Sequence, residues 1–202
     1  MKFHFKGIYK GKEHELDYLD EYYIKEHKPN AIEIPKRKKF FELKCELLSC
    51  AHVFLFSFIL CLRYPLVTSF ADLYFFLIIL TFFCLLSIIL LPVHEILHTI
   101  FNKQDSFFYL YPKHFCAFVM NIEEKTKFKK ILGFLLPSVI LGIIPFIIAI
   151  IFPQLKFLGF FAIPNIAWGS GDYMDTFHFL RYVPNGARIY SHKDGIYWYK
   201  PE

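Results

Sequence analysis

Long apolar stretches alternate with polar segments along this chain. Four helical stretches stand out, and they cover roughly residues 47–62, 73–101, 131–152 and 155–182. A helix needs about 20 mainly apolar residues to cross a lipid bilayer. The first stretch is short by this measure, so we expect its N-terminal turn to extend among the lipid headgroups. The pattern predicts a mostly α-helical, polytopic membrane protein with about four transmembrane helices.

Shorter segments with aromatic and β-branched residues predict a few β-strands. They cover residues 3–9, 107–111, 115–121, 187–192 and 196–199. Turn residues at 112–113 and at 193–195 would join the last four strands into two short β-hairpins. An exposed edge of the strands at 107–121 would be able to bind an extended peptide through main-chain hydrogen bonds, and an interfacial loop fits this stretch equally well.

The predicted elements divide the chain into three parts. Residues 1–46 form a polar N-terminal segment, residues 47–182 form the membrane domain with a polar loop at 102–130, and residues 183–202 form a C-terminal hairpin tail. Lysine and arginine are dense before the first helix, in the loop and in the tail, and they are scarce in the two other connections. Positive residues mark the cytoplasmic side, so we expect a multi-pass cell-membrane protein with both termini, the loop and the hairpins in the cytoplasm.

Composition supports this class and argues against others. Of the 202 residues, 55% are hydrophobic and 26 are phenylalanine, which is too apolar for an ordinary soluble domain. The net charge of +5 fits contact with anionic headgroups, and no nucleic-acid-binding motif accompanies it, so we expect membrane lipid as a partner and no nucleic acid. The five cysteines are odd in number and lack CxxC spacing, which predicts buried thiols without a disulfide framework.

The second apolar stretch ends in His94-Glu95-Ile96-Leu97-His98, which has the HExxH pattern. Residues four apart lie on one face of a helix, so His94 and His98 can bind one ion. Two neutral imidazoles suit Zn²⁺, and Glu95 at the edge of the site can take a proton from the bound water. Pro92 removes a backbone hydrogen bond and is expected to bend the helix near these residues. The alternative without a functional role is a solvated helix end, where the three side chains bind no ion.

The predicted topology indicates a third metal ligand on the fourth helix. The second and fourth helices both run inward, and at 1.5 Å per residue they reach His94 after about 31 Å and Asp172 after about 25 Å. Asp172 would complete a site of two histidines and one carboxylate with a fourth position open for water. Asp175 is the alternative ligand, although the glycines beside Asp172 leave more space for an ion. Asn165 lies on the same helical face as Asp172 and is a candidate contact for a substrate carbonyl or oxyanion.

A resemblance to known proteins adds to these patterns. The residues that carry it are HExxH, the strand at 115–121, the helix start Lys129-Lys130-Ile131 with its Pro137, and Asn165 followed by Gly169-Ser170-Gly171-Asp172. With these residues the chain resembles a bacterial family of small membrane proteins described as zincin peptidases. It is also similar to a reduced form of the site-2 proteases, which cut substrates within the membrane with HExxH and a later Asp, although their Asn-Pro-Asp-Gly motif is absent. The resemblance implies His94, His98 and Asp172 as zinc ligands and Glu95 as the catalytic base.

The leading interpretation is an integral-membrane zinc metalloprotease that hydrolyses a peptide or membrane-protein substrate near the cytoplasmic face. The alternative is a non-catalytic membrane protein in which the same residues hold a structural metal, and which acts as an accessory or interaction partner. Glu95 favours the enzyme, because a structural site needs a fourth ligand and no spare base. A fourth ligand from His52, His114 or His178 would favour the alternative; otherwise we expect His52 to be a core histidine bonded to a neighbouring helix. The sequence leaves the substrate and the oligomeric state open.

Overall fold

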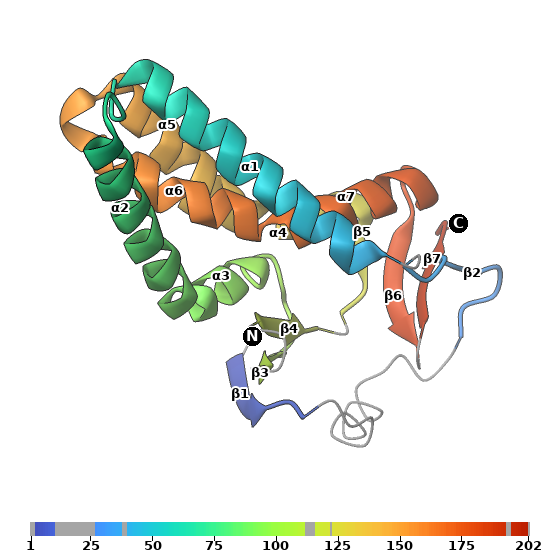
Figure 1. The fold of residues 1–202 in the computed structure, drawn as a ribbon. Coiled ribbons are helices and arrows are strands. Elements are labelled where there is room, and N and C mark those ends of the chain that lie inside the picture. The colour runs from blue at the N-terminus through green and yellow to red at the C-terminus, as the bar shows by residue number, and fades with distance from the viewer. Residues whose placement is uncertain are drawn as a thin grey trace. The chain divides into compact units, whose positions relative to one another are not determined.

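The computed structural model describes residues 3–10, 27–37, 40–111, 116–121, 123–192 and 195–201 (Figure 1). The chain forms two compact units. The helical unit comprises Lys39–His94 and Leu135–Met174, and the sheet unit comprises Met1–Lys38, Glu95–Phe134 and Asp175–Glu202. The predicted turn at 112–113, His114 and residues 193–194 of the second predicted turn lie outside the described residues.

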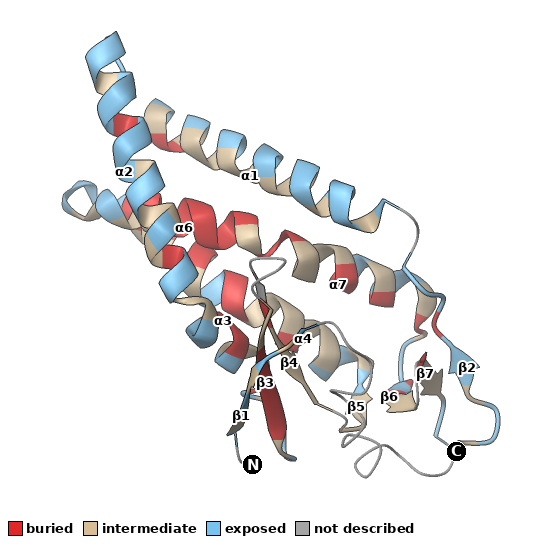
Figure 2. Cartoon of the chain, turned by 60° about the horizontal axis from the view of Figure 1, so that its bottom comes forward, coloured by how far each residue is buried: buried red, intermediate tan, exposed pale blue. Residues whose placement is uncertain are grey.

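The helical unit is organised around α6 (Phe157–Trp168), most of whose residues are buried. Three helices pack against it: α1 (Phe41–Arg63), α2 (Phe70–Ile89) and α5 (Ile144–Ile151). Figure 2 shows α6 largely as buried, whereas α1 and α2 keep long exposed faces. The core of this unit is therefore one buried apolar helix with three other helices packed against it, and Leu60, Ala162 and Ile163 are fully buried.

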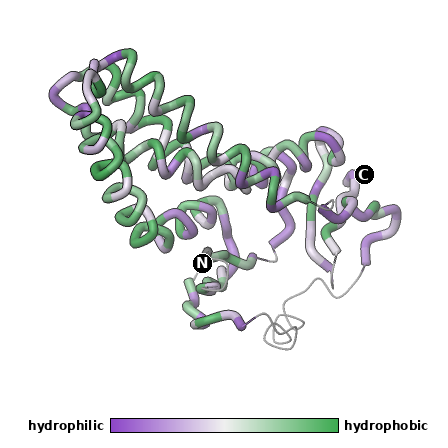
Figure 3. Tube along the Cα trace, in the orientation of Figure 1, coloured by the Kyte–Doolittle hydropathy of each residue, from purple (hydrophilic) through white to green (hydrophobic). Residues whose placement is uncertain are grey.

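Three helical stretches of the described residues are long and apolar enough to cross a membrane: Phe41–Arg63, Phe70–Ile89 and Lys127–Ile151. Figure 3 shows that hydrophobic residues predominate along these helices. Large apolar side chains on them are exposed, such as those of Phe54 and Phe70, which are 74% and 93% exposed. Apolar faces of this extent are unfavourable in water and suit a lipid environment. The expectation of a short first helix is wrong, because α1 has 23 residues.

The stretch predicted as one helix at 73–101 forms two helices. α2 ends at Ile89, and α3 (Leu91–His98) begins after Leu90, whose φ and ψ are −85° and −1°. Pro92 has no N–H to donate to the preceding turn, so the helical hydrogen-bond ladder lacks a bond at this point. The expected irregularity in the helix is therefore present, and it lies at Leu90, two residues before Pro92.

The stretch predicted at 131–152 is also subdivided. It forms α4 (Lys127–Ser138), the π-helix η3 (Val139–Ile143) and α5. Pro137 and Pro145 stand on either side of η3 and interrupt the regular hydrogen-bond ladder. A turn of the π type is rare and is frequently found at functional sites.

The fourth predicted helix breaks at Gly169, where ψ is 0°, and forms α6 and α7 (Ser170–Tyr182). A Cβ atom added to Gly169 would lie 1.9 Å from Ser138 Oγ and 3.1 Å from Tyr173 Cζ. A Cβ atom at Gly171 would meet nothing within 4 Å. A close approach of neighbouring side chains is therefore found at Gly169 and not at Gly171.

The described part of the sheet unit contains two small sheets. In the first, β1 (Phe3–Ile8) runs parallel to β3 (Ser106–Tyr111), and β4 (Cys116–Met120) pairs antiparallel with β3. In the second, antiparallel pairing gives the order β2 (Ile32–Glu33), β7 (Gly195–Tyr199), β6 (Arg188–His192) and β5 (Lys125–Thr126). Both predicted hairpins, β3–β4 and β6–β7, are confirmed. The pairing of β1 with β3 was not predicted.

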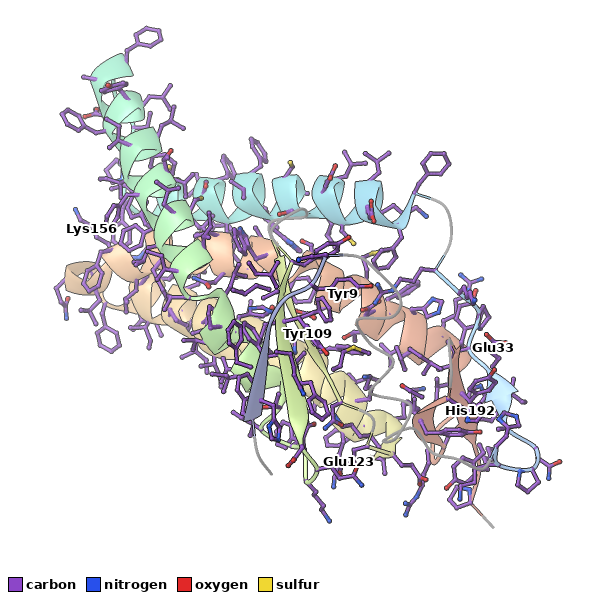
Figure 4. All side chains as sticks on the ribbon, turned by 90° about the horizontal axis from the view of Figure 1, so that it is seen from below. Tyr9, Glu33, Tyr109, Glu123, Lys156 and His192 are labelled. Carbon is purple, nitrogen blue, oxygen red and sulfur yellow. The ribbon has the colours of Figure 1, made fainter. Side chains whose placement is uncertain are left out.

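Aromatic side chains stabilise the first sheet across its strands. The rings of Tyr9 and Tyr109 meet edge to face with centroids 6.2 Å apart (Figure 4). Tyr109 stacks on Phe118 of β4 with centroids 5.2 Å apart. Such contacts contribute about 0.5–1.5 kcal/mol each beyond the burial of apolar area. They help to explain why the short N-terminal strand pairs with a hairpin distant in the sequence.

Candidate metal centre

α3 carries His94, Glu95 and His98 on adjacent turns. Among the described residues these three form a group able to hold a metal ion, since one possible ligand atom from each lies within 4.8 Å of the others. His94 and Glu95 are each only 8% exposed. A solvated helix end would leave these two side chains exposed. A buried carboxylate beside two imidazoles instead indicates a functional site.

Asp172 of α7 lies beside His94 within the helical unit. Its Oδ2 atom is 3.2 Å from His94 Nε2, and both side chains are largely buried. Two ligands of a tetrahedral zinc ion, each about 2.0–2.2 Å from the metal, are about 3.3–3.6 Å apart. The distance between His94 and Asp172 therefore suits two ligands of one ion with only a small adjustment.

His98 is oriented by a carbonyl group of α4 within the sheet unit. His98 Nδ1 lies 2.8 Å from the carbonyl oxygen of Gly133. A carbonyl only accepts hydrogen bonds, so Nδ1 carries the proton and Nε2 of the neutral ring carries the lone pair that a metal requires. In a regular helix this carbonyl would accept a hydrogen bond from residue 137, but Pro137 has no N–H. The proline thus makes the Gly133 carbonyl available to His98.

Asp175, the alternative ligand, has a different partner. Its Oδ2 atom accepts a hydrogen bond from Arg37 Nη2 at 2.5 Å, and this ion pair belongs to the sheet unit. The Asp175 side chain is 13% exposed and the Arg37 side chain 58%. The two carboxylates are therefore distinguished by their neighbours, since Asp172 lies beside a histidine of the motif and Asp175 beside an arginine.

Asn165 is buried in the helical unit, with an exposed fraction of 4%. Its Nδ2 atom donates to Ser87 Oγ at 3.1 Å and to the carbonyl of Phe161 at 2.7 Å. These bonds occupy both hydrogens of the amide and connect α6 to α2. A contact between Asn165 and a substrate oxyanion stays a prediction, and the observed bonds give this residue a structural role.

The other candidate histidines also have partners away from α3. His52 Nδ1 lies 3.3 Å from Ser170 Oγ, which confirms a core histidine bonded to a neighbouring helix. His178 Nε2 lies 2.8 Å from the carbonyl oxygen of Pro35. Both contacts are of the kind expected for structural histidines. His114 lies outside the described residues.

The residues around α3 fit a zinc ion. Two imidazoles and one carboxylate, with a fourth position open, form a common ligand set of catalytic zinc. A ligating histidine commonly donates its other ring N–H to a carbonyl or carboxylate, as His98 does to Gly133. Gly133 was not predicted as part of the site, although a proline four residues later is a signal for an available carbonyl. Arg37 was not predicted as the partner of Asp175 either, and its charge is the only sequence signal for this pairing.

Comparison with known proteins gives one match. The profile of a family described as "putative zincin peptidase" matches residues 87–188, just over half of the chain. This range contains α3, the strands β3, β4 and β5, and the helices that carry Asn165, Asp172 and Asp175. No curated protein and no solved structure matches the chain.

Proposed function

We propose that this chain, which belongs to the zincin peptidase family, is a membrane-embedded zinc metallopeptidase that cleaves peptide or membrane-protein substrates. His94, His98 and Asp172 would hold the zinc, and Glu95 would be the general base. The observation that carries the proposal is the short distance of 3.2 Å between Asp172 Oδ2 and His94 Nε2. His94 lies on the same helix as Glu95 and His98. The three long apolar helices support placement in a membrane.

The roles of the chain's own residues follow from their positions. Zinc, when bound, would activate a water molecule and polarise the scissile carbonyl. Glu95 would take a proton from that water at a carboxylate oxygen and return it to the leaving amine. Its burial limits competition from bulk water, which would otherwise weaken its interaction with the reacting groups. The Gly133 carbonyl keeps the proton of His98 on Nδ1, so that Nε2 can act as the metal ligand.

The same proposal includes the topology. α6 is only 12 residues long, and with α7 it would form a fourth crossing interrupted at Gly169. The distribution of lysine and arginine supports cytoplasmic termini and a cytoplasmic loop at 102–130. Cleavage would then occur near the cytoplasmic face, in the manner of a reduced site-2 protease.

The role of Glu95 is tested by measuring zinc content and peptide hydrolysis together. Glu95→Gln keeps the size of the side chain but removes the proton acceptor, so we expect zinc to remain bound while turnover falls by roughly 10²-fold or more. His94→Ala removes a ligand and should lose both zinc and activity. Glu46→Gln on the exposed surface of α1 and His178→Ala are the matched controls, and both should keep zinc and activity.

The same measurement distinguishes the peptidase from the non-catalytic alternative, in which the metal has a structural role. One observation favours that alternative. Glu95 lies in the same 4.8 Å group as the two histidines, and it would itself be a ligand if the site were structural. Loss of zinc from Glu95→Gln would show that Glu95 binds the metal. Retention of zinc with unchanged hydrolysis would exclude Glu95 as the base.

The third ligand is tested by a pair of matched substitutions one turn apart on α7. Asp172→Asn should lower zinc affinity by about tenfold or more, because an amide oxygen is a weaker ligand than a carboxylate. Asp175→Asn removes the negative charge that faces Arg37 and Lys130 and leaves Asp172 in place, so zinc should be retained while the free energy of unfolding falls. Zinc titration of both purified variants checks this, and the opposite ranking would assign the metal to Asp175.

A further inference from the structure

A pocket of about 310 Å³ lies within the helical unit. Its walls are mainly apolar and come from α1, η3 and α6, through residues that include Phe56, Val139, Ile143 and Ile166. Ser138 and Tyr173 add two hydroxyl groups to the lining. This combination of apolar walls with a few polar groups is typical of sites that bind small molecules or single side chains.

The walls of this pocket are held in place by contacts within the unit. The ring of Phe56 meets that of Phe146 edge to face, with centroids 4.8 Å apart. His52, which also lines the pocket, bonds to Ser170 and lies with its ring 5.3 Å from that of Tyr173. Two lining residues come from the π-helix η3, whose wide turn changes the direction of side chains along this helix. The pocket is therefore built by the fold and does not depend on a mobile surface loop.

The two hydroxyl groups give the pocket polar atoms that can bind a ligand. Ser138 is 1% exposed. Its hydroxyl interacts with that of Tyr173, and in the described part of the chain neither hydroxyl has a hydrogen-bond partner of normal geometry. A buried hydroxyl with unused hydrogen-bonding capacity is stabilised when a ligand supplies the missing partner.

The position of the pocket connects it with the candidate metal centre. Tyr173, which lines the pocket, directly follows Asp172 in α7, and both belong to the helical unit. We infer that this pocket binds a large apolar side chain of the substrate, such as phenylalanine or leucine, next to the bond that is cleaved. The inference rests on the proposed zinc peptidase function. Ser138 and Tyr173 would hydrogen-bond to the main chain that carries this side chain.

A series of peptide hydroxamates tests this assignment without requiring hydrolysis. A hydroxamate binds zinc directly, and compounds that differ only in one adjacent side chain, alanine, leucine or phenylalanine, report on the pocket. The dissociation constant of each compound is measured on the zinc-loaded full chain in lipid nanodiscs. We expect the phenylalanine compound to bind about tenfold or more tightly than the alanine compound.

Two neighbouring residues of η3 provide a matched pair of variants. Val139 lines the pocket and Ile140 does not, yet both are 38% exposed, so each position tolerates a larger side chain. Val139→Phe should fill the pocket and bring the ratio of the two dissociation constants close to one. Ile140→Phe should leave that ratio unchanged. Val139→Ala, which only adds space, should keep the preference for phenylalanine.

The possible outcomes separate this inference from the proposed function. Equal affinities across the series on a protein that binds zinc and hydroxamates would overturn the pocket assignment alone. The pocket assignment would also be overturned if Val139→Phe keeps the preference for the phenylalanine compound but reduces the amount of lipid that copurifies with the protein. An acyl chain would then be the occupant of the pocket. Absence of zinc binding and of hydroxamate binding would refute the proposed function, and the pocket assignment with it.

Discussion

Lys125 places its amine in a buried polar network of the sheet unit. Its Nζ atom donates to Asn102 Oδ1, and Asn102 Nδ2 donates to the fully buried Ser106 Oγ at 2.9 Å. Burial, together with the nearby positive charge of Lys130, lowers the pKa of Lys125 to about 7, while Glu123 acts in the opposite direction. A lysine counted in the sequence only as a topological charge therefore titrates near physiological pH.

This pKa predicts that the protein becomes more stable as the pH rises from about 7 towards about 10. In that range the unfolded chain, in which lysine has a pKa of about 10.4, binds a proton that the folded protein does not, so the free energy of unfolding increases with pH. Lys125→Met should flatten this increase, and Lys129→Met, at an exposed position, should not. Thermal unfolding in detergent at pH 7 and pH 9 checks the prediction, which equal pH slopes for all three proteins would contradict.

Residues related by short sequence spacing were the most predictable part of the candidate site. His94, Glu95 and His98 form a group because four residues make about one helical turn. Asp172 was expected beside His94 from helix direction and length, and it lies 3.2 Å away. The partners of Asp175 and Asn165 were not predicted, because Arg37 and Ser87 belong to no motif and the sequence does not record which side chains of two packed elements meet.

At the junction between α6 and α7, a single residue, Gly169, determines how closely the side chain of Ser138 can pack against the backbone. Gly169 allows the side chain of Ser138 on α4 to come close to the backbone, and Gly171 two residues later does not face such a contact. The two glycines therefore have different roles, although their sequence context is nearly the same. Gly169 is required by the contact with Ser138, whereas no neighbouring atom requires a glycine at position 171.

Gly169→Ala should destabilise the protein strongly, because the added Cβ would lie 1.9 Å from Ser138 Oγ. Overpacking of this kind costs about 1–3 kcal/mol or more. Gly171→Ala has open space and replaces glycine by the best helix former, so its effect should be neutral or stabilising by up to about 1 kcal/mol. Thermal unfolding of both variants in detergent gives the comparison, and similar melting temperatures would contradict the steric explanation.

Element boundaries followed from the sequence where local chemistry determines them. The apolar stretches and both hairpins are present, and Pro92 marks the end of a helix. The parallel pairing of β1 with β3 could not be predicted, because it joins residues about 100 positions apart and has no turn signal. The π-helix η3 was not predicted for another reason: hydrophobic periodicity does not record a local change in the hydrogen-bond pattern between Pro137 and Pro145.

At the scale of the whole molecule, the number of membrane crossings determines on which side each terminus lies. Three stretches of the described residues satisfy the length and composition of a span, and α6 alone does not. An odd number of crossings would place the two termini on opposite sides. The proposed fourth crossing by α6 and α7 places them on the same side.

Single cysteines in a cysteine-free variant distinguish these topologies. Thr126→Cys and Lys200→Cys, both at exposed positions, should react with an impermeant maleimide only after the cells are permeabilised. Gln154→Cys, in the short connection between α5 and α6, should react in intact cells. Reaction of Lys200→Cys in intact cells, with Thr126→Cys protected, would show that α6 and α7 do not return the chain to the cytoplasm.

The carbonyl left unbonded by Pro137 also bears on how this metal centre could be transplanted. HExxH on a foreign helix would carry two imidazoles and a carboxylate, but it would lack the acceptor that fixes the tautomer of His98. For the two histidines, the smallest transferable unit is thus α3 together with the turn of α4 from Gly133 to Pro137, and the proposed third ligand, Asp172, has to be supplied in addition. In protein engineering, a proline placed four residues after a glycine on a neighbouring helix would leave the glycine carbonyl available to orient a histidine.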